Sequence, residues 1–160
     1  MNKFNLCLLI LLSLVVTSCT RNLDGKYIVY KIIEDNHHEF GPYGGYINDT
    51  IYTFLKTQLQ SKKYSIKFKK DFAKLTTLSN NEDMVLAKEI GQDGNPYYIQ
   101  ETKQGVAECK FVLLPKQDSL LLGVTMRVPA DQPLIQPVQL GGLDTRYKIN
   151  RVVCYLSKIE

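Results

Sequence analysis

The sequence predicts a mainly β fold, a single antiparallel β-barrel of about eight strands with one α-helix after the first strand. Eight short segments are rich in β-branched and aromatic residues, as strands are. One segment spaces its apolar residues as a helix does, and the connections are short enough for antiparallel hairpins. Eight antiparallel strands are enough to close a barrel and remove exposed sheet edges. The predicted strands span residues 26–33, 62–70, 72–78, 84–90, 96–102, 106–114, 119–128 and 147–157.

The first strand and the helix come from the N-terminal third of the chain. "KYIVYKII" (26–33) is β-branched and aromatic, and the polar, glycine-rich stretch 34–46 that follows it predicts a loop. Asn48 or Asp49 is suited to cap the helix, which we expect to cover an open end of the barrel. The apolar positions at helical spacing are Ile51, Phe54, Leu55 and Leu59.

The remaining strands follow as hairpins. In "KKYSIKFKK" (62–70), Tyr64, Ile66 and Phe68 fall on one face and the polar residues between them on the other, which predicts a half-buried strand. "GQDGNP" and "PKQDS" have the composition of turns and precede two later strands.

The N-terminus has the pattern of a secretory signal. Lys3 is the only charge before a mainly apolar run from Leu6 to Val16. This run is shorter than the roughly 20 apolar residues that a membrane-spanning helix needs. It ends in "VTSC" at Cys19, which resembles the lipobox of bacterial lipoproteins, with Thr and Ser in place of the commoner Ser and Gly. The alternative is an ordinary secretory signal with an incidental cysteine.

The lipobox resemblance implies that residues 1–18 are removed and that the Cys19 thiol carries diacylglycerol, with fatty acids such as palmitate. Three acyl chains in total would make the membrane anchor effectively permanent. Thr20 stands where an inner-membrane lipoprotein of many Gram-negative bacteria has Asp. We therefore expect the outer membrane, with the periplasmic side favoured over the cell surface.

The rest of the chain is the right size for one domain. Without residues 1–18 it has 142 residues and a formal charge of +3. We expect residues 19–24 to form a lipidated N-terminus and short tether, and residues 25–160 to form the barrel domain. Nucleic acid is excluded as a partner by the compartment.

Two cysteines remain after Cys7 is removed with the signal. Cys109 and Cys154 each lie in a predicted strand, and the oxidising periplasm permits a disulfide between them. The alternative is two buried thiols that act as small apolar side chains. No patterned partner suggests a metal or catalytic role for either.

A second resemblance concerns the barrel itself. The stretch 23–27, "LDGKY", at the start of the first strand resembles the Gly-x-Trp opening of lipocalins, with Tyr27 in place of Trp. Lipocalins and the related fatty-acid-binding proteins carry an arginine on the last strand that packs near this aromatic ring. The resemblance implies that role for Arg151.

The polar clusters have ordinary explanations beside functional ones. Asp35, His37, His38 and Glu39 have metal-ligand chemistry, but adjacent histidines on a strand point to opposite faces, so a solvated loop is favoured and no metal is expected. The densest basic stretch predicts either a wet strand face, which is favoured, or a patch for anionic headgroups or an acidic partner. Its lysines are 62, 63, 67, 69, 70 and 74.

The segment 128–144 is the strongest candidate for contact with a ligand or partner. Its three prolines exclude a helix and a central strand. Long irregular segments in compact domains are often functional. Its apolar residues predict either packing across the barrel mouth or a contact with a partner: Leu134, Ile135, Val138 and Leu140.

No catalytic motif is present, so we expect a protein that is not an enzyme and needs no cofactor. Two functions remain. The first is a binding module for a small apolar or amphipathic ligand within the barrel. The second is an accessory or an inhibitor or immunity-type interaction protein of an envelope complex. A cavity of a few hundred Å³ would favour the first, and a filled core with an exposed apolar patch would favour the second.

Overall fold

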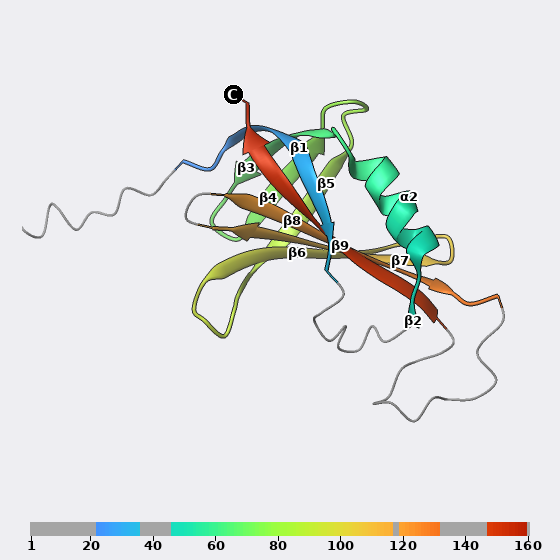
Figure 1. Ribbon diagram of the computed structural model, residues 1–160. Helices are drawn as coiled ribbons and strands as arrows, with labels where there is room; N and C mark the ends of the chain where they lie inside the picture. The colour runs from blue at the N-terminus through green and yellow to red at the C-terminus, as the bar shows by residue number, and fades with distance from the viewer. Residues whose placement is uncertain (1–21, 36–45, 117–118, 132–146, 160) are drawn as a thin grey trace, which may run out of the picture.

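The computed structural model describes residues 22–35, 46–116, 119–131 and 147–159. These residues form a closed, eight-stranded antiparallel barrel, a short extra strand and one helix (Figure 1). The elements in chain order are β1 (Gly25–Glu34), β2 (Tyr46–Ile47), α2 (Asp49–Leu59), β3 (Lys63–Phe68), β4 (Phe72–Thr77), β5 (Asp83–Ile90), β6 (Pro96–Gln104), β7 (Ala107–Pro115), β8 (Leu120–Pro129) and β9 (Tyr147–Lys158).

The barrel is an up-and-down meander. From β3 to β9 each strand pairs with the next in antiparallel fashion, and β1 pairs antiparallel with both β3 and β9. Figure 1 shows β1 and β9, the first and last strands, lying side by side where the ring closes. The two-residue strand β2 adds parallel to the start of β9. The predicted fold class, a mainly β barrel with a helix after the first strand, is confirmed.

The antiparallel order gives the barrel two distinct ends. The tether end carries the start of β1, the end of β9 and the turns β3–β4, β5–β6 and β7–β8. The distal end carries the end of β1, the helix, and the turns β4–β5 and β6–β7. β1 pairs with β3 only over Gly25–Ile28, whereas its pairing with β9 continues to Glu34 past a bulge between Val29 and Lys31. β1 and β3 therefore separate toward the distal end, where β1 remains paired only with β9.

The helix α2 contacts β9 and β1. It begins where the Asn48 side chain accepts hydrogen bonds from the backbone N–H groups of Thr50 and Ile51, because a capping Asn satisfies donors that the first turn leaves unpaired. Its buried face, Ile51, Leu55 and Leu59, joins the barrel core. The sequence pattern also placed Phe54 on this face. That prediction is wrong, because the side chain is 49% exposed.

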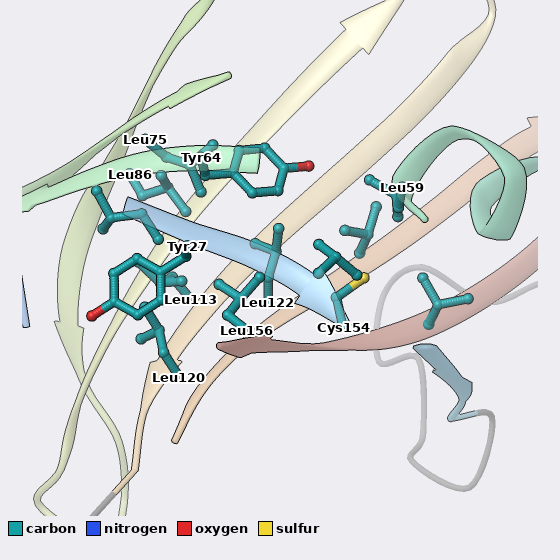
Figure 2. Close-up of a cluster of buried hydrophobic side chains, with 14 of the residues drawn as sticks. Tyr27, Leu59, Tyr64, Leu75, Leu86, Leu113, Leu120, Leu122, Cys154 and Leu156 are labelled. Atoms are coloured by element: carbon teal, nitrogen blue, oxygen red, sulfur yellow. The ribbon is translucent and has the colours of Figure 1, made fainter. Parts of the chain in front are cut away.

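The core fills the barrel interior at the tether end. Strand alternation sends one side chain of each pair inward, and the inward ones are large and aliphatic. Figure 2 shows them converging from several strands, with Leu59 of the helix and Cys154 of β9 in the same cluster. Those 2% exposed or less include Ile66, Leu86, Leu113, Leu120 and Leu122.

Candidate functional site

The interior wall changes character from the tether end to the distal end. On β8, Leu120, Leu122 and Val124 are buried, whereas Met126 and Val128, further along the same face, are only half-buried. The same change occurs on the neighbouring strands, where half-buried and polar side chains replace fully buried leucines. We call this region the distal wall, and it consists of Gln100, Cys109, Phe111, Met126, Val128 and Asn150.

Asn150 is the only buried polar residue of the described core and is fully inaccessible to solvent. Its Nδ2 donates to Glu34 Oε1 at 2.6 Å and to the Asn48 carbonyl at 3.3 Å. Both partners are acceptors, so they fix the orientation of the amide. Asn150 Oδ1 then has no donor. A buried acceptor left unpaired costs about 1–3 kcal/mol, so a donor that reached this oxygen would stabilise the folded protein.

Gln100 supplies a second acceptor of the same kind on β6. Its Oε1 is buried and has no hydrogen-bond partner. Gln100 pairs with Phe111, which packs against the core, so its side chain also belongs to the interior face. β6 and β9 are three strand spacings apart, about 14 Å around the wall. The distal wall therefore offers two separated acceptors with an apolar strip between them.

Cys109 is the third polar group of the distal wall. It pairs with Thr102 and Met126 and is half-buried. Burial raises the pKa of its thiol above the ordinary value. The thiol form, which is a poor nucleophile, therefore dominates at neutral pH.

The possible disulfide between Cys109 and Cys154 is not formed. Both residues are free thiols, and β8 lies between their strands. Cys109 pairs with Met126 and Cys154 with Leu122, which places them two strand spacings and four residues apart. That separation is about 16 Å, whereas bonded cysteines have Cα atoms within about 7 Å. Cys154 instead fits the other interpretation of the sequence, a buried thiol that acts as a small apolar side chain. Burial raises its pKa to about 12.

The contact between Tyr27 and Arg151 that the lipocalin resemblance implied is also not formed. Tyr27 is buried at the tether end, pairs with Lys158 and donates from its hydroxyl to the Leu23 carbonyl at 2.6 Å. Arg151 lies seven residues earlier on β9, so it is about 23 Å away and on the opposite face. There it pairs with Asp35 at 3.5 Å.

The basic stretch of the sequence does not form one patch. Lys62 and Lys63 lie at the distal end, and Lys74 forms an ion pair with Asp83 at 2.6 Å. Lys69 and Lys70 lie in the β3–β4 turn at the tether end, with Lys67 just before it.

Two surface hollows lie at the tether end. One, of about 600 Å³, lies between the β5–β6 and β7–β8 turns and is lined by Asn95, Tyr97 and Lys116 among others. The other, of about 250 Å³, lies beside Leu23 and Tyr27. Both are open to solvent and differ from the enclosed ligand site that we expected within the barrel.

Several predicted site residues lie outside the described residues. They are Cys19, the apolar residues Leu134, Ile135, Val138 and Leu140, and the loop residues His37, His38 and Glu39. Within the described part of the chain, no group of three potential metal ligands is found. Over the same residues, no helix has the length and apolarity to cross a bilayer.

The chain matches no protein-family model and no curated protein. Its function is therefore argued from its own residues and geometry.

The sequence reasoning did not single out Gln100 or Asn150. A signal for Asn150 was present, because Asn150, Val152, Cys154 and Leu156 alternate along one face of β9. A polar residue at the end of such an apolar face indicates a buried amide. Gln100 carries a weaker signal, because polar residues continue after it along β6.

Proposed function

We propose that the protein is a lipoprotein anchored to the outer membrane through Cys19 and facing the periplasm, and that it binds a small amphipathic molecule at the distal wall without catalysis. The anchor is supported by the lipobox-like "VTSC" after an apolar run. The binding role is supported by the distal wall.

The observation that carries the binding role is the pair of unpaired acceptors, Gln100 Oε1 and Asn150 Oδ1. Buried polar atoms without partners are rare in folded proteins, and a water molecule or a ligand donor would satisfy these two oxygens. Two acceptors select a ligand with N–H or O–H donors, and half-buried Phe111, Met126 and Val128 suit an apolar body between them. An amphipathic amine, amide or alcohol has this chemistry.

Binding without catalysis fits the ionisation state of the wall. The Cys109 thiol stays protonated because burial raises its pKa. Gln100 and Asn150 are amides, which neither donate nor accept protons in catalysis at neutral pH. The wall thus holds recognition groups without an activated nucleophile or base.

Native mass spectrometry of the purified protein tests this proposal. We expect a co-purified small molecule on the wild type and its loss in Gln100→Leu, which removes one of the two acceptors. Gln58→Leu, on the exposed face of α2, is the matched control and keeps the molecule. Because Gln100→Leu also removes an unpaired buried oxygen, its stability should be equal or higher. A wild-type protein with no bound molecule under conditions that preserve weak complexes would contradict the binding role.

A second candidate, the envelope interaction protein, is favoured by the outside of the barrel. A row of apolar residues crosses seven paired strands on the outer wall, and two exposed apolar side chains, Phe72 and Val85, lie in it and beside it. Exposed apolar surface often marks a protein contact, and this row is exposed at Phe72 and Ala87 but buried at Gly123 and Val153. An empty wild-type protein together with capture of an envelope protein, abolished by Val112→Lys, would select this function. The row runs through Phe72, Ala87, Ile99, Val112, Gly123, Val153 and Ile33.

A further inference from the structure

Three hydrogen bonds fasten residues 22–24 to the tether end of the barrel. The Lys158 ammonium donates to the Asn22 carbonyl at 3.2 Å, and the Tyr27 hydroxyl donates to the Leu23 carbonyl at 2.6 Å. The Asp24 carboxylate accepts from the Phe68 N–H at 2.7 Å. Half of the expected tether, residues 22–24, is therefore part of the folded domain and does not act as a free spacer.

This attachment shortens the distance between the domain and a lipid at Cys19. Asn22 is three residues after Cys19, and three residues of chain span at most about 11 Å even when fully extended. Electrostatic screening at physiological ionic strength acts over a similar distance, about 8–10 Å. Charges at the tether end would therefore interact with the charges of the leaflet that holds the anchor.

The side chains beside this attachment are basic. Phe68, which binds Asp24, is flanked by Lys67 and Lys69, and Lys70 follows in the same turn. All three lysines are exposed, and none forms an ion pair with another described residue. Lys67 lies directly opposite Lys74, and like charges at this position repel each other. Asp71 in the same turn and Asp24, whose carboxylate accepts from the Phe68 N–H, offset two of the three charges, so this turn keeps an excess of one positive charge.

We propose that Lys67, Lys69 and Lys70, the tether-end lysines, bind the anionic headgroups of phospholipids in the leaflet that Cys19 enters. This inference rests on the proposed lipidation of Cys19. An acidic protein would also suit three lysines, but nothing would require its site to lie next to the anchor. A membrane surface must meet this end of the barrel, because the tether brings it there.

The contact fixes the orientation of the barrel. With the β3–β4 turn against the headgroups, the distal end points away from the leaflet, because the two ends lie at opposite ends of the strands. The distal wall then lies at the end of the barrel away from the leaflet. The anchor alone restrains one point, whereas the anchor and the lysine contact together restrain the tilt.

Lysine footprinting on the full chain, expressed with its own signal and reconstituted into vesicles, tests the proposal. The vesicles contain phosphatidylcholine alone or phosphatidylcholine with phosphatidylglycerol, and an amine-acylating reagent reports the accessibility of each lysine by mass spectrometry. We expect acylation of Lys69 and Lys70 to slow about fivefold in the anionic vesicles, the effect of roughly one favourable lysine contact. High salt should remove most of this protection.

Lys56 on α2 and Lys103 at the distal end of β6 are the matched control, since both are exposed and far from the tether end. Their acylation should be equal in the two kinds of vesicle. The inference would be overturned if Lys69 and Lys70 were acylated at the same rate in neutral and anionic vesicles. Flotation of the same samples separates the two proposals: failure to float with neutral vesicles contradicts the anchor, whereas flotation without protection contradicts only the headgroup contact.

Discussion

Asn150 shows how much one polar side chain can connect in this barrel. It lies on β9 and donates to Glu34 on β1 and to the Asn48 carbonyl at the start of α2. These three elements meet at the distal end, where β1 no longer pairs with β3. A single amide thus ties the helix to the strands that close the barrel.

We predict that Asn150→Ala lowers the free energy of unfolding by about 2 kcal/mol, because two hydrogen bonds and the packing of a fully buried side chain are lost. Urea unfolding followed by circular dichroism measures the change. Asn95→Ala removes an exposed side-chain hydrogen bond in the β5–β6 turn and should cost less than about 0.5 kcal/mol. Equal losses in the two variants would contradict the role assigned to Asn150.

The buried thiol of Cys154 makes stability depend on pH in alkaline solution. Its pKa is about 12 in the folded protein against 9.0 for an unperturbed thiol. Below pH 9 both states are protonated and the thiol has no effect. Above pH 9 the unfolded chain loses the proton and the folded chain keeps it, so stability falls as pH rises.

We therefore expect the wild type to lose about 1 kcal/mol between pH 8 and pH 10 that Cys154→Ala does not lose. Burial also raises the pKa of Tyr64 in the folded protein above its ordinary value of 10.0. Tyr64 therefore lowers stability mainly above pH 10, outside this window. Urea unfolding across the pH series measures the two slopes. If the free energy of unfolding fell equally with pH in the wild type and in Cys154→Ala, the Cys154 thiol would have the same pKa in the folded and unfolded protein.

At the scale of single elements, the stability of the helix α2 depends on Asn48, the residue that caps its N-terminus. The Asn48 side chain accepts hydrogen bonds from the N–H groups of Thr50 and Ile51 at 3.1 and 3.2 Å. Asn48→Ala should cost about 1 kcal/mol, whereas Asn48→Asp should retain most of the stability, since both Asn and Asp cap helices well. Thermal unfolding distinguishes the variants, and an equal loss in both would mean that the cap contributes little.

The strands and the helix were predictable from the sequence because their signals are local. The alternation of Tyr64, Ile66 and Phe68, and turn stretches such as "GQDGNP", mark each hairpin without knowledge of its neighbours. Every predicted strand and the helix agrees with the structure to within one or two residues. The parallel strand β2 was missed, because two residues carry no periodicity.

The site was not predictable in the same way, because it depends on which strands adjoin. The distal wall combines Gln100 on β6 with Asn150 on β9, residues that no local pattern relates. The disulfide between Cys109 and Cys154 was a wrong prediction, because β8 lies between their strands and the strand register, which the sequence alone does not give, places them four residues out of alignment. The expected contact between Arg151 and Tyr27 was wrong, because membership of the last strand does not determine on which face, or near which end of the barrel, a side chain lies.

At the scale of the whole molecule, stability depends on which side of the barrel wall a residue faces. Leu121 and Leu122 are neighbours on β8, but Leu122 is 1% exposed and belongs to the core, whereas Leu121 is half-buried on the outer wall. We predict a loss of about 3 kcal/mol for Leu122→Ala and about 1 kcal/mol for Leu121→Ala. Urea unfolding of both variants measures the difference. A similar loss for both would contradict the assignment of inside and outside.

The pairing of β1 with β9 has a consequence for biosynthesis. A chain whose synthesis stops before Tyr147 has nothing to place between β1 and β8, so both strands keep a free hydrogen-bonding edge. Such edges recruit other chains and invite proteolysis. Completion of the last strand is thus the step that turns an aggregation-prone sheet into a finished product, and truncated copies should be cleared by proteases before they accumulate.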